Sequence, residues 1–206
     1  MTTRSRWDRL YRGNKHFLKW PSEHVVRWAA GIDGKGKTAL DIGCGAGRHL
    51  PVLWETGAEV YGIDASPEAV AYCQTEWGMM TAIEVGDMTA IPHSDNMFDL
   101  ALAYAVFYYG PQELHIGAIR EMHRVLKPGG QAFVVVRSER DTRRTAEPLE
   151  EEATMGDESG MTLNFVEEED IEHLYRSFTD VRWELTETTR HGRQWLDSDW
   201  LIAVTK

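Results

Sequence analysis

The stretch "ALDIGCGAGRHL", residues 39–50, joins an apolar strand to a glycine-rich turn. Its first residues are apolar apart from Asp41, which is typical of a strand buried on both faces. Gly43, Gly45 and Gly47 then stand at every second position. Glycine lets the backbone adopt positive φ and approach a ligand closely. In an open parallel sheet, ligands bind at the carboxyl ends of the strands. We therefore expect this turn to lie at a ligand site, although glycines can also serve the turn alone.

The spacing of these glycines argues against a dinucleotide. The dinucleotide fingerprint is G-x-G-x-x-G, in which the third glycine lets the helix approach the sheet. Counted from Gly43, that third glycine would be residue 48, which is Arg48. An NAD(P)-linked oxidoreductase is therefore a disfavoured alternative.

Composition and charge limit the remaining classes. The chain has 206 residues, enough for one domain with a full core. Its formal net charge of −11 disfavours general nucleic-acid binding, which needs a basic face. The two cysteines, Cys44 and Cys73, form neither a disulfide framework nor a metal motif. The polar start does not resemble a signal peptide, and no apolar run has the roughly 18 residues of a membrane span. We expect a cytoplasmic protein without a metal, and the sequence leaves its oligomeric state open.

Strand and helix patterns alternate along the chain, which predicts a parallel sheet with helices on both faces. Pro51 falls inside the helix expected after the glycine turn, so we expect a kink there. Ser66 and Pro67 mark the start of another helix. The predicted strands are 38–42, 58–64, 80–87, the start of 97–109, 131–137, a strand around 181–185, and 199–206, with later helices at about 112–126 and 167–178.

The glycine turn resembles the S-adenosylmethionine (SAM) loop of the class I methyltransferases, in which an acid and one further residue precede G-x-G-x-G. The match is complete at Asp41, Gly43, Gly45 and Gly47. SAM carries no phosphate but has an α-ammonium group, ribose hydroxyls and a sulfonium, and carboxylates suit the first two.

Further motifs follow in the family's order. Asp64, at the end of "VYGID", matches the acid that accepts from both ribose hydroxyls, and Asp87 matches the acid that accepts from the adenine amino group. The segments 97–109 and 123–130 resemble the fourth-strand motif and the segment before the fifth strand. The resemblance covers about residues 37–137. It implies an α/β fold with a seven-stranded, mostly parallel, doubly wound sheet whose last strand is antiparallel.

The resemblance also implies a set of cofactor-binding residues and an arrangement of the chain. We expect one domain over 1–206, with 1–36 as a helical cap and 138–163 as a mobile loop. The N-terminal segment is expected to fold over SAM, with Tyr11, His16 and Trp20 as candidates. The full cofactor set, for SAM and its product S-adenosylhomocysteine, is Asp41, Gly43, Cys44, Gly45, Gly47, Asp64, Ala65, Asp87, Met88, Ala103, Tyr11 and Trp20.

The acceptor side is less defined, because methyl transfer needs orientation of the acceptor and only sometimes a general base. Tyr104, Tyr108 and His191 are the catalytic candidates, and Tyr109 and Trp195 are possible neighbours. Tyrosine rings bind a sulfonium through cation–π contacts or stack on a planar acceptor. Asp99 is expected to be structural, accepting backbone donors where a strand begins.

Two interpretations of the segment after the fifth strand stay open. Arg137, Arg140, Arg143 and Arg144 precede six acidic residues between 147 and 158. The arginines form a cluster for an anionic acceptor, or the segment is a solvated loop with internal ion pairs; the second interpretation is favoured.

Absent motifs narrow the activity. The chain lacks a D/N-P-P-Y/F run, a proline–cysteine dipeptide, and a paired-glutamate loop after the fourth strand. DNA amino methylation, cytosine C5 methylation and protein-arginine methylation are thus disfavoured. The predicted function is SAM-dependent methylation of a small molecule at O, N, S or C, since the fold does not select among them. Because no general base can be identified, the alternative is a catalytically silent SAM-binding sensor or partner subunit.

Overall fold

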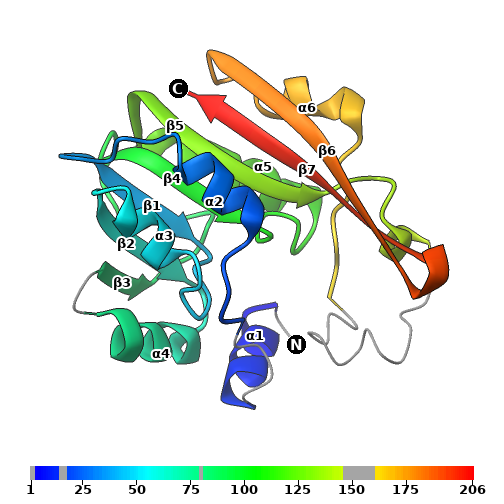
Figure 1. The fold of residues 1–206 in the computed structure, drawn as a ribbon, viewed down its shortest axis with the longest axis horizontal. Coiled ribbons are helices and arrows are strands. Elements are labelled where there is room, and N and C mark those ends of the chain that lie inside the picture. The colour runs from blue at the N-terminus through cyan, green and yellow to red at the C-terminus, as the bar shows by residue number, and fades with distance from the viewer. Residues whose placement is uncertain (1–2, 14–17, 79–80, 146–160) are drawn as a thin grey trace.

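The computed structural model describes residues 3–13, 18–78, 81–145 and 161–206. Within these residues, seven strands form one sheet in the order β3-β2-β1-β4-β5-β7-β6 (Figure 1). The strands are β1 (Thr38–Ile42), β2 (Glu59–Asp64), β3 (Thr81–Val85), β4 (Phe98–Tyr104), β5 (Leu126–Arg137), β6 (Asp180–Arg190) and β7 (Trp195–Thr205). The β7 strand is antiparallel to both β5 and β6. The predicted mostly parallel sheet with an antiparallel last strand is therefore confirmed.

Helices cover both faces of the sheet. They are α1 (Thr3–Arg12), α2 (Glu23–Ala29), α3 (Leu50–Glu55), α4 (Pro67–Trp77), α5 (Gln112–Val125) and α6 (Glu168–Leu174), with short 3₁₀ turns η1 (Thr142–Arg144) and η3 (His191–Arg193). Residues of α2, α3 and α4 share one apolar cluster with Val60 and Phe133. Residues of α5 and α6 share the other with Leu40 and Ile202. Because side chains alternate between the faces of a strand, the sheet is buried on both sides.

Local sequence signals explain most element boundaries. The Ser66 hydroxyl caps α4 by accepting a hydrogen bond from Ala69 N, and Pro67 occupies its first turn. The Ser22 hydroxyl likewise accepts from His24 N at the start of α2. The α6 helix is shorter than predicted and ends at Leu174, but Tyr175 and Phe178 beyond it stay buried.

The predicted kink at Pro51 is wrong. The α3 helix begins only at Leu50, so Pro51 lies in its first turn. A backbone N–H has no intrahelical partner at that position, and proline therefore disrupts nothing. Residues 43–49 form the expected glycine-rich turn between β1 and this helix.

The expected structural role of Asp99 is confirmed. Its carboxylate accepts hydrogen bonds from Thr38 N at 2.9 Å and from Lys127 Nζ at 2.6 Å. These bonds join the start of β1 to β4 and β5, at the end of the sheet opposite the glycine loop.

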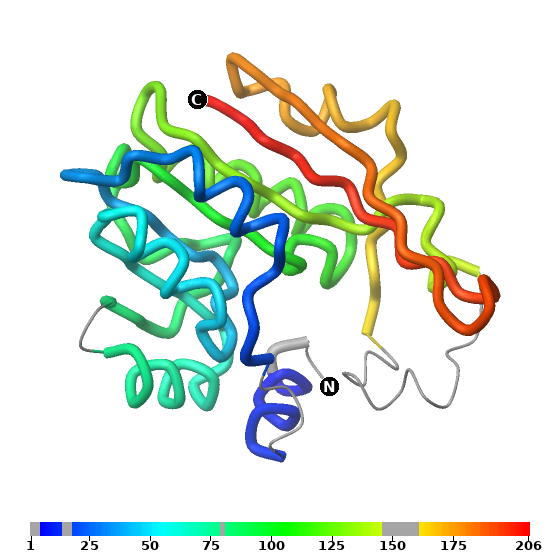
Figure 2. The backbone as a smooth tube through the Cα atoms, viewed as in Figure 1, coloured from blue at the N-terminus to red at the C-terminus, as the bar shows by residue number. Residues whose placement is uncertain are grey.

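The N-terminal helix α1 lies beyond the carboxyl ends of the central strands, apart from the two helical layers (Figures 1 and 2). Its closest helical neighbour is α4. In the described part of the chain, no helix is long and apolar enough to cross a bilayer.

Candidate cofactor and acceptor site

The glycine loop after β1 needs glycine for conformational and steric reasons. Gly43, Gly45 and Gly47 have φ values of 71°, 55° and 84°. A Cβ at Gly43 would lie 2.5 Å from Val106, and one at Gly45 would lie 2.5 Å from the Tyr11 hydroxyl. At Gly47 it would lie 2.6 Å from the Trp77 ring. The loop therefore comes close to α1, α4 and the segment after β4 at once.

Asp64, at the end of β2, holds this loop in place. Its two carboxylate oxygens accept hydrogen bonds from Gly45 N at 2.9 Å and from Ser66 N at 2.8 Å. Burial raises its pKa, and the two backbone donors oppose that rise. Each carboxylate oxygen has two lone pairs, so both can accept further bonds from ribose hydroxyls.

Asp41 is a buried acid whose Oδ2 has no hydrogen-bond partner among the described residues. Its side chain is almost fully buried in β1, directly before the glycine loop. Burial raises its pKa to about 7; Arg48 acts to lower the pKa, and Asp64 acts to raise it further. A cationic ligand group would satisfy this acceptor and favour its charged form.

Helix α1 covers the glycine loop. Tyr11 is buried against Gly45, and burial, followed by the nearby Asp64 carboxylate, raises the pKa of its hydroxyl. The Asp8 carboxylate accepts a hydrogen bond from Ser66 Oγ, and Arg12 pairs with Glu68 at 3.0 Å. Tyr11 therefore lies against the glycine loop, and its role in binding the cofactor stays a prediction.

Other N-terminal predictions have different outcomes. The Trp20 side chain is 77% exposed, so it does not line the loop in this conformation. His16 lies outside the described residues. Trp7 packs edge-on against Tyr109, with ring centroids 4.9 Å apart. It is partly buried against the apolar cluster that contains residues of α5 and α6.

The remaining cofactor candidates lie along the same sheet edge. Asp87 is exposed, and its Oδ1 accepts hydrogen bonds from Thr89 N and Thr89 Oγ1, so it caps a short turn. Met88 and Ala65 are half-buried, whereas Ala103 is fully buried within β4. The Asp87 geometry matches a local turn and leaves its second oxygen for a ligand.

These residues fit SAM in kind. The unpartnered oxygen of Asp41 suits the α-ammonium, Asp64 retains acceptor capacity for a ribose, and a Cβ at Gly45 would fill the cradle beneath Tyr11. SAM has no phosphate, so its loop does not have to bind one. This agrees with the departure of the glycines from the dinucleotide spacing.

A cavity of about 320 Å³ opens beside this loop, at the carboxyl ends of β4 and β5. It is formed by one face of neighbouring strands, because residues two apart in β5, β6 and β7 point the same way. The register places Asp199 opposite both Arg137 and Thr186, and Asp197 opposite Thr188. The lining residues are His24, Tyr104, Ala105, Tyr108, Val135, Arg137, Arg143, Thr186, Thr188, Arg190, Asp197 and Asp199.

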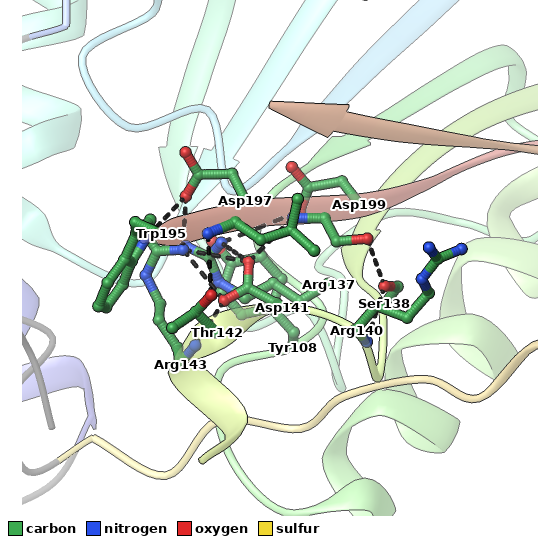
Figure 3. A network of polar contacts seen from close by, with 12 residues as sticks. Tyr108, Arg137, Ser138, Arg140, Asp141, Thr142, Arg143, Trp195, Asp197 and Asp199 are labelled. Atoms are coloured by element: carbon green, nitrogen blue, oxygen red, sulfur yellow. Dashed lines mark hydrogen bonds and ion pairs between the residues drawn. The ribbon is translucent and has the colours of Figure 1, made fainter. Parts of the chain in front are cut away.

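Ion pairs build the charged wall of the cavity (Figure 3). Buried Asp141 accepts hydrogen bonds from the Arg137 and Arg143 guanidinium groups and from Ser198 N. Asp197 pairs with Arg143 at 2.7 Å and also with Arg190. The wall is therefore charged yet largely self-neutralising.

The four arginines predicted to form a cluster fall into two groups. Arg137 and Arg143 line the cavity, whereas Arg140 pairs with Glu187 and Arg144 pairs with Glu167 near the surface. In residues 138–145 the arginines form ion pairs, as the second interpretation expects, and an anionic acceptor for the cluster stays a prediction. The six acids between 147 and 158 lie outside the described residues.

Aromatic rings form the side of the cavity toward the glycine loop. The Arg48 guanidinium lies 4.9 Å from the centre of the Tyr104 ring, and the buried His49 ring packs against the same tyrosine. Burial lowers the pKa of His49 to about 3, and its Nε2 accepts from Ser22 N. Tyr108 is buried beneath the Arg137 guanidinium, 4.7 Å from its ring centre.

The two late candidates do not line the cavity. His191 is exposed in the turn η3, between β6 and β7. Trp195 is buried beneath Arg143, which lies 5.2 Å from its ring centre, so it supports the wall from behind. Sequence reasoning missed His49, Arg190, Asp197 and Asp199, and it considered Arg48 only as a departure from a motif. The alternation of charged residues in β7 was an available signal.

Comparisons with known proteins agree with this geometry. Residues 40–134 match a family model described as a methyltransferase domain. A ubiquinone biosynthesis O-methyltransferase of Pseudomonas paraeruginosa is 37% identical over 140 residues, which are 62% of this chain and 56% of that protein. A demethylmenaquinone methyltransferase of Bacillus licheniformis is 33% identical over 113 residues, which are 51% of this chain and 47% of that protein. The chain thus matches about half the length of these relatives.

The fold comparison extends over the whole chain. A SAM-dependent methyltransferase of Anabaena variabilis has a TM-score of 0.74 at 14% identity, covering 100% of this chain and 95% of that one. The strand order is that of the class I methyltransferase fold, and the family model for a methyltransferase domain matches residues 40–134, just under half of this chain. The family and the cofactor SAM that the sequence predicts are supported by this domain match and by the fold.

Proposed function

We propose that this chain transfers the methyl group of SAM to a small polar acceptor. The observation that carries the proposal is the cavity of about 320 Å³ beside the glycine loop, which is lined mainly by charged and hydroxyl-bearing side chains. Its size is at the lower end of typical small-molecule sites. A protein that only sensed SAM would not need such a second compartment.

In this proposal the cofactor residues have separate tasks. Asp41 binds the α-ammonium group, Asp64 binds the ribose hydroxyls, and Asp87 and Met88 bind the adenine. Gly43, Cys44, Gly45, Gly47, Ala65 and Ala103 form the surrounding wall. Tyr11 closes the site from α1, with residues 1–36 acting as a cap on a single domain. The site of action proposed is the cytoplasm.

The chain's contribution to the reaction is then mainly orientation. The methyl group of SAM is already activated, and displacement requires the acceptor atom in line with the sulfur–carbon bond. Tyr104 and Ala105 end β4 between the loop and the cavity, and Val106 touches Gly43, so the two compartments adjoin. An acceptor in the cavity would meet the cofactor there.

Turnover of methyl-labelled SAM with a panel of small metabolites tests the proposal. We expect label transfer to at least one polar acceptor, and no transfer by the Gly45→Val variant, in which valine collides with Tyr11. Circular dichroism verifies that the variant is folded. SAM binding in calorimetry without transfer to any panel member would favour the silent binder.

A further inference from the structure

Two carboxylates, Asp197 and Asp199, line the acceptor cavity, and a third, Asp141, is buried beside the arginines of its wall; the three differ in how firmly they are held. Asp141 is fully buried and accepts from two arginines and a backbone N–H. Asp197 is 18% exposed and pairs with Arg143 and Arg190. Asp199 is 27% exposed, and its Oδ1 lies 4.0 Å from Arg137 Nη1, at the outer limit of an ion pair. Asp199 is therefore the carboxylate best able to exchange its contact for one with a ligand.

The position of Asp199 is fixed by the sheet. It lies in β7 between Arg137 of β5 and Thr186 of β6, and it lines the cavity together with Tyr104. Further along the same face of β7, Leu201 and Ala203 pack in the apolar cluster. This face of β7 is thus apolar in the core and acidic at Asp199, where the cavity begins. Core packing therefore does not explain why residue 199 is an aspartate.

The charge environment suits a group that gains and loses a proton. Burial raises the pKa of Asp199 to about 6, with Arg137 lowering it and Asp141 and Asp197 raising it. Arg143 faces it from η1, and His24 of α2 and Tyr108 line the same cavity. An effective general base has a pKa near the working pH.

We propose that Asp199 accepts the proton that the acceptor loses during methyl transfer, and hence that the acceptor reacts through an O–H or N–H group. A lone pair on the acceptor oxygen or nitrogen forms the new bond to the methyl carbon. The sulfur–carbon bond breaks, and its electron pair stays on the sulfur of S-adenosylhomocysteine. The acceptor proton passes to an Asp199 carboxylate oxygen. This inference rests on the proposed function, because it needs an acceptor in the cavity.

The test compares the wild type with Asp199→Asn, using labelled SAM and the acceptor identified in the metabolite panel. We expect kcat to fall by at least about 100-fold in the variant. The SAM dissociation constant should stay unchanged in calorimetry. In the wild type, kcat/KM should fall on acidification below about pH 6, and the residual activity of the variant should lack this limb. Asp199→Glu should restore part of kcat.

Two control variants separate the role of Asp199 from general effects. Asp180→Asn removes an exposed carboxylate at the far end of β6, where Asp180 pairs with Arg182, and should leave kcat unchanged. His24→Gln tests a second titratable group of the cavity. If His24→Gln abolishes the acidic limb and Asp199→Asn keeps it, the proton goes to His24 and the inference is wrong.

The remaining outcomes also decide the matter. Methylation confined to a thioether or a tertiary amine, which has no proton to lose, overturns the inference while the methyltransferase function stands. Wild-type binding of SAM without any transfer overturns the proposed function and this inference with it. Equal kcat values for the wild type and Asp199→Asn overturn the inference alone.

Discussion

At the scale of one residue, Asp41 shows that a side chain placed to bind a ligand can lower the stability of the ligand-free protein. Its carboxyl pKa is raised to about 7 in the folded chain, against 3.8 for an ordinary aspartate. The folded state therefore binds this proton more tightly, and the resulting stability is present below about pH 4 and lost as the pH rises through 7. A bound ammonium group would remove the penalty.

The first prediction concerns Asp41→Asn in the SAM-free protein. At pH 8 the variant should be more stable than the wild type by about 1–3 kcal/mol, because it carries no buried charge. The difference should shrink toward pH 4, and SAM affinity should fall at pH 8. Urea denaturation at both pH values and calorimetry measure these effects. An equal change in stability at both pH values would show that the charge of Asp41 is not the cause.

The second prediction concerns Asp64→Ala. Removal of the carboxylate should weaken SAM binding by roughly 2–4 kcal/mol, since charge-assisted hydrogen bonds to the ribose are lost. The same change leaves Gly45 N and Ser66 N without their acceptor, so some of the loss comes from the loop. Asp64→Asn, which keeps oxygen acceptor capacity, should recover part of the affinity in calorimetry. Unchanged affinity in a folded Asp64→Ala variant would refute the ribose assignment.

Sequence alone predicted the residues that belong to a contiguous motif. Asp41 and the three glycines belong to one strand and its following turn, and Asp64, at the end of β2, was predicted from the family resemblance. The cavity wall could not be predicted in this way. Asp199 faces Arg137 only because β7 inserts antiparallel between β5 and β6, and that pairing joins residues far apart in the chain.

At the scale of elements, boundaries were less predictable than identities. The Pro51 kink failed because proline disrupts the interior of a helix but not its first turn, and the sequence pattern did not show where α3 begins. The β5 strand begins at Leu126, earlier than predicted, because Leu126 pairs with Phe98 before an irregularity in the register. The KPGG sequence that follows Leu126 is typical of a turn, so the sequence did not predict this pairing. In contrast, α4 was well defined, because Ser66 and Pro67 both mark its start.

The third prediction concerns helix α1. Its contacts with α4 include the exposed ion pair Arg12–Glu68 and the hydrogen bond from Ser66 Oγ to Asp8, and exposed ion pairs contribute little stability. Amides of α1 should therefore exchange faster than those of β1 and β4 in the free protein, and should slow when S-adenosylhomocysteine packs beneath Tyr11. In Tyr11→Ala this slowing should be much reduced. Hydrogen exchange followed by mass spectrometry provides the measurement. If α1 were as protected as β1 without ligand, it would be a fixed wall.

At the scale of the whole molecule, polar contacts join segments that lie far apart in the sequence. The buried His115 of α5 accepts or donates at both ring nitrogens, to Asn164 at 3.1 Å and to the Tyr175 hydroxyl at 3.4 Å. These contacts connect α5 to the segment that leads into α6 and to the end of that helix. The described part of the chain after residue 160 is thus held to the main body by buried polar contacts as well as by apolar packing.

The last prediction uses this histidine to test that connection. Burial lowers the pKa of His115 to about 4, from the 6.5 of an ordinary histidine. Below pH 6.5 the unfolded chain gains a proton that the folded chain does not accept, so this residue should destabilise the fold on acidification until the pH reaches about 4. Relative to His115→Gln, the wild type should therefore lose up to about 2 kcal/mol between pH 7 and pH 5. Comparison of the two proteins cancels the opposite contributions of Asp41 and Asp199, whose raised pKa values favour the folded state at low pH. Urea midpoints at pH 7, 6 and 5 measure the difference in stability between the two proteins. A difference that is the same at all three pH values would mean that His115 has an ordinary pKa and is not shielded from water at its contacts with Asn164 and Tyr175.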